Sequence, residues 1–103
     1  MSAPQPFVIA IAGFGWWGKH MANRLVGHPF LQVAGIIEPM EANHAAITDM
    51  GLTVWTDLSE ALAKEGVDAI ILTTPNPLHE AQVIQCAKAG KHVFCEEPLG
   101  LTA

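Results

Sequence analysis

The chain alternates between short apolar runs and longer stretches in which apolar and polar residues are mixed. The apolar runs cover residues 7–12, 31–37, 52–55, 67–72 and 92–95, and glycine or proline stands close to each of them. Short runs of this kind, bounded by residues that break regular structure, are typical of strands buried on both faces of a sheet. We therefore predict five strands over these ranges.

The stretch between the first two runs predicts an amphipathic helix. Gly18, Met21, Ala22 and Leu25 recur there at helical spacing opposite polar residues, and Gly27 ends the pattern. One face of this helix is therefore expected to pack on the sheet while the other faces water.

The next two mixed stretches also predict helices, each with its own signal. In the first, Ala42, Ala45 and Ala46 are expected to form a narrow face for close packing. In the second, Asp57 with Glu60 three residues later is a variant of the capping box, which starts a helix. We expect that helix to continue as far as the next glycine.

A fourth helix is predicted over residues 76–89, with Asn76 as its cap and Pro77 in its first position, which proline tolerates well. Gly90 closes it, and residues 101–103 are expected to begin one more helix. Three residues of the fourth helix are expected to face the core: Val83, Cys86 and Ala87.

Strands that alternate with helices in this way require crossover connections between parallel strands. The sequence therefore predicts an α/β fold: a doubly wound parallel sheet of the Rossmann type, with helices on both faces in a three-layer αβα arrangement. No repeat, low-complexity tract or linker divides the chain. We expect one domain over residues 1–103, truncated after about five strands.

Composition narrows the class of protein. Half of the 103 residues are hydrophobic and 15% are charged, which excludes a disordered chain. The formal net charge is −5, with 5 Lys and Arg against 10 Asp and Glu and no basic cluster, so no nucleic acid partner is expected. No apolar run is long enough to span a bilayer, and the first residues lack the basic start of a secretory signal. A cytoplasmic protein with no membrane partner is therefore expected.

The two cysteines, Cys86 and Cys95, show neither CxxC pairing nor the spacing of a disulfide framework. We expect both thiols to be reduced and to serve as small core residues. His92 and Cys95 stand three apart on a predicted strand and therefore point to opposite faces, so no metal site is predicted.

Residues 13–18 read Gly-Phe-Gly-Trp-Trp-Gly, which is the pattern G-x-G-x-x-G. The pattern alone is weak, but here it follows a predicted buried strand and opens a predicted helix. In that context Gly13 permits a tight turn, Gly15 lets the backbone approach a pyrophosphate, and Gly18 lets helix and strand pack closely. The amides of the helix N-terminus then bind the phosphates. The sequence thus predicts a dinucleotide site.

Three aromatic residues lie inside this motif and belong to the candidate site: Phe14, Trp16 and Trp17. Two roles stay open for Trp16 and Trp17. Either they pack the first helix against its neighbours or against another domain, or they contact the cofactor directly. We favour packing.

An acid ends the second predicted strand. Glu38 follows Gly18 by about 20 residues, the distance at which such folds place the carboxylate that binds the adenosine ribose hydroxyls. It would repel a 2′-phosphate, and the next residues, Pro39, Met40 and Glu41, supply no cation. The sequence therefore predicts NAD as the cofactor, preferred over NADP.

A polar loop follows the fourth predicted strand and reads Thr73-Thr74-Pro75-Asn76. It lies beside the point where the strand order of a doubly wound sheet reverses, and ligands enter such sheets there. We expect its polar groups to line the nicotinamide side, and for Asn76 a role as N-cap is equally supported. His79, in the first turn of the next helix, is expected to point toward the same crevice.

At these positions the sequence resembles the Gfo/Idh/MocA family of oxidoreductases over residues 7–103. The resemblance rests on four features, which are residues 13–18, Glu38, Thr74-Pro75-Asn76-x-x-His79, and the stretch from Ala89-Gly90-Lys91-His92-Val93 to Glu96-Glu97-Pro98-Leu99. It implies an N-terminal NAD-binding Rossmann domain followed by a larger domain on an open antiparallel sheet. That second domain carries much of the sugar or polyol site, and we expect it to be absent from this chain.

The resemblance also implies the activity, a reversible hydride transfer between the nicotinamide and a sugar-like or polyol substrate. It adds Glu96 and Pro98 to the candidate cofactor-binding residues. The family has Glu-Lys-Pro at this point, but this chain has Glu97 in place of the lysine. An ionised glutamate donates no hydrogen bond, so we assign no catalytic residue. We expect this chain to bind NAD without turnover and its full-length parent to be a dehydrogenase.

Two other functions remain as alternatives. The chain is either a non-catalytic dinucleotide-binding or sensing module that lost the lysine, or, less favoured, a methyltransferase with a similar glycine loop. The second leaves residues 74–76 and 90–98 unexplained. The fifth strand is also expected to leave an exposed sheet edge and apolar surface, from which we predict a homo-oligomer.

Overall fold

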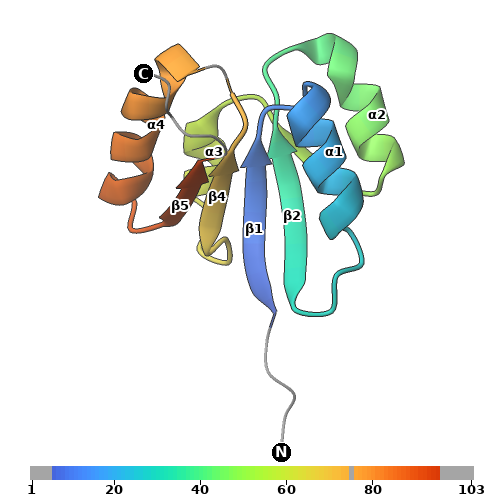
Figure 1. Ribbon diagram of the computed structural model, residues 1–103, viewed down its shortest axis with the longest axis horizontal. Coiled ribbons are helices and arrows are strands. Elements are labelled where there is room, and N and C mark those ends of the chain that lie inside the picture. The colour runs from blue at the N-terminus through green and yellow to red at the C-terminus, as the bar shows by residue number, and fades with distance from the viewer. Residues whose placement is uncertain (1–5, 75, 96–103) are drawn as a thin grey trace, which may run out of the picture.

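The computed structural model describes residues 6–74 and 76–95, which form one sheet with helices on both faces (Figure 1). The strands are β1 (Phe7–Ala12), β2 (Leu31–Ile37), β3 (Thr53–Trp55), β4 (Ala69–Leu72) and β5 (His92–Cys95). Their order is β3-β2-β1-β4-β5, and every pair is parallel. The predicted doubly wound parallel sheet is confirmed.

The helices follow the strands in alternation. They are α1 (Trp16–Leu25), α2 (His44–Asp49), α3 (Leu58–Leu62) and α4 (Asn76–Lys88), and the short 3₁₀ helix η1 (Glu41–Asn43) precedes α2. In Figure 1, α1 and α2 lie on one side of the view and α4 on the other. Buried residues of α1 and α2 belong to one half of the core and those of α3 and α4 to the other, which confirms the three-layer αβα arrangement.

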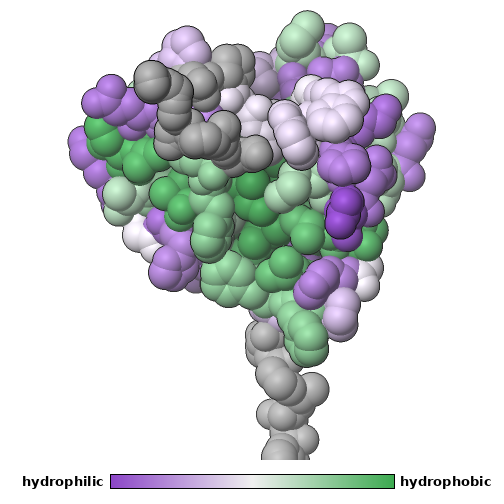
Figure 2. All heavy atoms as spheres, viewed as in Figure 1, coloured by the Kyte–Doolittle hydropathy of each residue, from purple (hydrophilic) through white to green (hydrophobic). Residues whose placement is uncertain are grey.

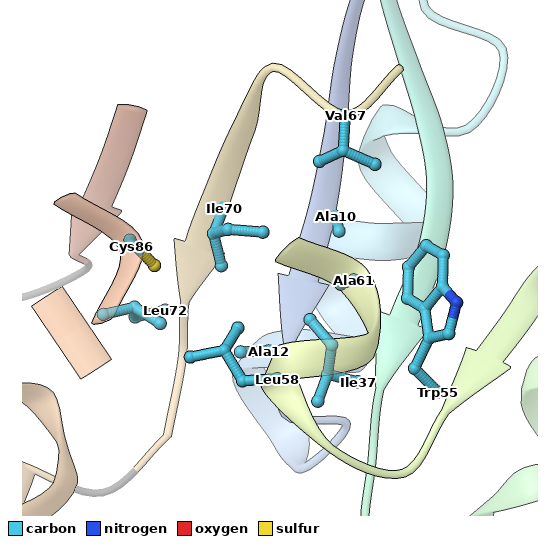
Figure 3. Close-up of a cluster of buried hydrophobic side chains, with 10 residues drawn as sticks. All are labelled: Ala10, Ala12, Ile37, Trp55, Leu58, Ala61, Val67, Ile70, Leu72 and Cys86. Carbon is cyan, nitrogen blue, oxygen red and sulfur yellow. The ribbon is translucent and has the colours of Figure 1, made fainter. Parts of the chain in front are cut away.

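The central strand β1 divides the core into two halves, because successive side chains of a strand point to opposite faces. Ile9 and Ile11 pack with buried residues of α1 and α2, whereas Ala10 and Ala12 pack with residues of α3 and α4. Figure 3 shows the second cluster, in which Cys86 of α4 lies beside Leu72 of β4. Burial on both faces explains why β1 and β4 read as unbroken apolar runs.

The predicted packing face of α2 is wrong, and that of α4 is wrong at one residue. Ala42, Ala45 and Ala46 are exposed, and the buried residue of α2 is Ile47. In α4, Ala87 is exposed although it was predicted to face the core. An alanine contributes little apolar area, so the orientation of a short helix is set by its one large aliphatic side chain. Val83 and Cys86 do pack on the core, as predicted.

The capping box at the start of α3 is confirmed. The Asp57 carboxylate accepts from the Ser59 amide, and the Glu60 carboxylate accepts from the amides of Thr56 and Asp57 at 2.8 and 3.1 Å. These two amides, that of Thr56 first, lower the pKa of Glu60. The helix ends at Leu62, earlier than predicted.

One cysteine prediction is confirmed and the other is wrong. Cys86 is fully buried, and burial raises the pKa of its thiol, whereas Cys95, at the end of the edge strand β5, is exposed. Because the thiolate is the reactive form, we expect one thiol per folded chain to react quickly with a disulfide reagent at neutral pH. The second should react only in denaturant. Spectrophotometric titration checks this, and two equally fast thiols would contradict it.

One of the two edge strands, β5, presents an apolar surface. Its register places Phe94 beside Ile71, on the face where Ile11 of β1 also lies, and Phe94 is 54% exposed. Figure 2 shows apolar residues gathered in the middle of this view, between α4 and α1.

Within residues 6–74 and 76–95, no helix has the length and apolar character to cross a membrane.

Candidate functional site

The carboxyl ends of three central strands meet at the turn that follows β1. The Gly13 amide donates to the carbonyl of Ile37 on β2 at 2.8 Å. On the other side, the Thr73 amide donates to the carbonyl of Ala12 at 3.0 Å. The glycine motif is therefore held between β2 and β4, at the edge of the sheet where ligands of doubly wound folds bind.

The fold itself requires glycine at two of the three motif positions. Gly13 has a φ of +104°, which residues with a side chain rarely adopt, and a Cβ there would lie 2.7 Å from Thr73 Oγ1. A Cβ on Gly18 would lie 2.1 Å from the carbonyl oxygen of Gly13. Both glycines allow α1 to leave β1 at close range, as the sequence predicts.

Gly15 differs from the other two glycines, because nothing in the fold requires it. Its φ is −75°, and a Cβ built on it meets no atom within 4 Å. It is the N-cap of α1, without a side-chain cap, and the first turn of α1 contains no acid. The space in front of the helix N-terminus is therefore open to a ligand, and the amide dipoles favour an anion.

Phe14 belongs to the core rather than to the open side of the loop. Its side chain is 6% exposed and packs among Ile9, Ile11 and other residues beneath α1 and α2. Its amide donates to Glu38 Oε1 at 2.9 Å. Only the backbone of Phe14 is thus available to the candidate site.

Glu38 lies directly beside the glycine motif and is 5% exposed, the one buried charged residue among those that the structure describes. Its Oε1 accepts from the Phe14 amide and its Oε2 from the Met40 amide, both at 2.9 Å. Charge-assisted bonds of this kind are the strong ones. The carboxylate thereby joins the glycine motif, residues 13–18 (the phosphate loop of the proposals below), to the segment that follows β2.

The two tryptophans do not pack into the core of this chain. Trp16 is 71% exposed and Trp17 is 50% exposed. Trp16 stacks on His20 with ring centroids 5.2 Å apart, and meets Trp17 edge to face at 4.9 Å. Packing of these residues against neighbours of α1 is therefore wrong within the described chain, whereas packing against another domain, the other part of the favoured prediction, and contact with the cofactor stay predictions.

The two threonines after β4 use their hydroxyl groups within the chain. Thr73 Oγ1 donates to the Ala12 carbonyl at 2.9 Å, and Thr74 Oγ1 donates to Gln82 Oε1 of α4 at 2.5 Å. Both threonines are half-buried, and they fix the loop against β1 and α4. Four candidate positions lie outside the described residues: Pro75, the side chain of Asn76, Glu96 and Pro98.

His79 stands in the first turn of α4, as predicted. It is half-buried, and neither of its ring nitrogens has a hydrogen-bond partner in the part of the chain that the structure describes. A neutral imidazole offers one donor and one acceptor, so His79 has the capacity to bind a polar ligand group. No cluster of three metal-ligating side chains occurs among the described residues.

Sequence reasoning missed two residues of this region. His44 Nε2 lies 2.7 Å from the main-chain carbonyl of Glu38, and Gln82 accepts from Thr74. Neither stands in a motif, and each acts through a contact between elements that the sequence does not show. The one sequence signal that could have identified them is a polar residue on the same helix face as a core residue.

The family model described as "Oxidoreductase family, NAD-binding Rossmann fold" matches residues 7–103. An inositol 2-dehydrogenase from Rhodococcus erythropolis is 38% identical over 102 residues, which cover 96% of this chain and 30% of that protein. The chain therefore spans less than a third of the length of this relative.

Solved structures give the same result. The scyllo-inositol dehydrogenase from Lactobacillus casei, with bound NAD(H) and scyllo-inositol, matches 95% of this chain and 30% of its own, with a TM-score of 0.82 and 28% identity. A biliverdin reductase from Synechocystis, in complex with biliverdin and NADP+, covers 95% of this chain and 31% of its own, with a TM-score of 0.85 and 29% identity. Similar structures thus include both an NAD(H) and an NADP+ complex.

Proposed function

The chain belongs to the Gfo/Idh/MocA family of oxidoreductases, with an NAD-binding Rossmann fold, and on this premise we propose that it binds NAD at the carboxyl edge of its sheet. The diphosphate lies over Gly15, in front of the N-terminus of α1. The adenosine ribose lies at Glu38, and the nicotinamide lies toward Thr74 and His79.

The observation that carries this proposal is the contrast among the three motif glycines. Gly13 and Gly18 are explained by backbone conformation and packing, but Gly15 has open space where a Cβ would stand. What distinguishes Gly15 from other open glycines is its place at the N-cap of α1, beside the carboxyl edge of the sheet, and we attribute it to a ligand whose atoms occupy that space. The first amides of α1 follow directly after Gly15, have no side-chain cap, and favour a doubly charged diphosphate.

The preference for NAD rests on Glu38. Each carboxylate oxygen accepts one backbone amide and keeps a lone pair, so the two oxygens together suit the two hydroxyls of a ribose. A 2′-phosphate would bring a second negative charge to a buried carboxylate that is already fixed in place. Desolvation strengthens the repulsion between them.

We propose a dehydrogenase of sugars or polyols as the activity of a protein with the length of the relatives. When bound, NAD would supply the acceptor for the hydride that leaves the alcohol carbon. The residues of this chain hold the diphosphate and the ribose and orient the nicotinamide face; by themselves they bind NAD without turnover. Within this proposal the protein is cytoplasmic, and self-association through the β5 edge stays a prediction.

Direct titration tests the proposed function. Isothermal calorimetry with NAD, NADP and S-adenosylmethionine is expected to show saturable binding of NAD, with NADP at least about tenfold weaker, a difference of about 1.4 kcal/mol. Equal affinities for the two dinucleotides would contradict the role of Glu38. Binding of S-adenosylmethionine in place of NAD would contradict the oxidoreductase itself.

A further inference from the structure

The hydrogen bonds around Glu38 engage all of its polar groups, on its backbone and on its side chain. Its amide donates to the Trp55 carbonyl at 2.7 Å, and its carboxylate accepts from Phe14 and Met40. The remaining group is its own main-chain carbonyl, which lies 2.7 Å from Nε2 of His44. A carbonyl oxygen only accepts, so this ring nitrogen carries the hydrogen and donates it.

His44 is the first residue of α2 and is half-buried, six residues after the acid. Between them the chain passes through Met40 and η1, a segment that is exposed except for Asn43 and carries no other side-chain bond to Glu38 in the described structure. The imidazole therefore ties the start of α2 to the end of β2. Without it, the segment would be held to Glu38 by the Met40 amide alone.

We propose that His44 is a positioning residue of the adenosine-ribose subsite: by holding the Glu38 carbonyl, it fixes the carboxylate that joins the phosphate loop to the segment after β2. This inference rests on the proposed function. It adds to that function a residue that lies outside every motif. It also implies that the preference for NAD depends on how rigidly the Glu38 carboxylate is fixed. A carboxylate that turns away would open room for a 2′-phosphate.

The test compares three variants of the full chain by calorimetry with NAD, ADP-ribose and NADP. H44L removes the donor. It is expected to lower the affinities for NAD and ADP-ribose by the same factor, about five- to tenfold, which is the usual contribution of one hydrogen bond. The affinity for NADP should fall by a smaller factor, so that the ratio of NAD affinity to NADP affinity becomes smaller. H44Q keeps an N–H at similar reach and should restore the affinities to within about twofold.

H28L is the matched control. His28 Nδ1 accepts from the Phe30 amide at 3.0 Å, at the opposite end of β2, so this variant loses a comparable bond far from the site. It should bind all three ligands as the wild type does. Thermal melts of each variant separate a local effect from unfolding.

The outcomes are distinct. If the wild type binds NAD and H44L binds it with the same affinity, the inference is overturned and the proposed function stays intact. An H44Q variant that folds fully but binds as weakly as H44L would also overturn the inference alone. A wild-type chain that binds no dinucleotide would overturn the proposed function and the inference together.

Discussion

Replacing Gly18 by alanine is expected to lower the free energy of unfolding by about 2–3 kcal/mol, and the Tm by roughly 10–20 °C. The new Cβ would stand 2.1 Å from the Gly13 carbonyl oxygen and 2.7 Å from the carbonyl carbon. Both are backbone atoms, so α1 has to move away from the turn, which costs packing beneath it. Circular dichroism melts measure the effect.

Gly15→Ala is the matched control, because it makes the same chemical change three residues away in open space. Alanine is a poorer N-cap than glycine but restricts the unfolded chain, and these two effects offset to within about 0.5 kcal/mol. This variant should keep its Tm and lose NAD affinity at least about tenfold. If Gly15→Ala binds NAD normally, the diphosphate does not pass over this residue.

Glu38→Gln is expected to lower both the stability and the NAD affinity. The amide supplies one acceptor oxygen, so either the Phe14 or the Met40 amide faces an NH₂ group and loses its bond. Loss of a buried charge-assisted bond costs about 1.5–3 kcal/mol. Thermal melts and NAD calorimetry on the same sample measure the two effects.

The control for charge is Glu41→Gln, on η1, where the side chain is exposed. It removes the same charge three residues away and should change neither the Tm nor the affinity. Equal effects of the two variants would mean that Glu38 acts through general charge and not through its two bonds. An unchanged Tm in Glu38→Gln would contradict its structural role.

The strand bounds could be predicted closely because each strand is a short apolar run next to glycine or proline, and the central strands β1 and β4 are buried on both faces. β1, β2 and β5 have the predicted bounds, and β4 begins two residues later than its run. The helix faces were less readable. For α2 the alanine spacing predicts the wrong face, because the orientation of this six-residue helix is decided by Ile47, which is fully buried against the sheet.

The candidate site was predicted as far as its motif reaches. The role of Gly13 and Gly18 in the turn and in helix packing could be read from the sequence, because both follow from local geometry. The contact between Glu38 and the Phe14 amide could not, since it joins residues 24 apart across two strands. The exposure of the two tryptophans could not be predicted either. Large aromatic residues are usually buried, and nothing in the neighbouring sequence indicates which surface they contact.

The position of β1 in the sheet has a consequence for how the protein is made. β1 pairs with β2 on one side and with β4 on the other, and β4 is complete only at Leu72. When only β1, β2 and β3 have emerged from the ribosome, the edge of β1 that later pairs with β4 is therefore exposed. Ribosome-bound intermediates of this length should attract chaperones, and the binding should end once β4 has emerged.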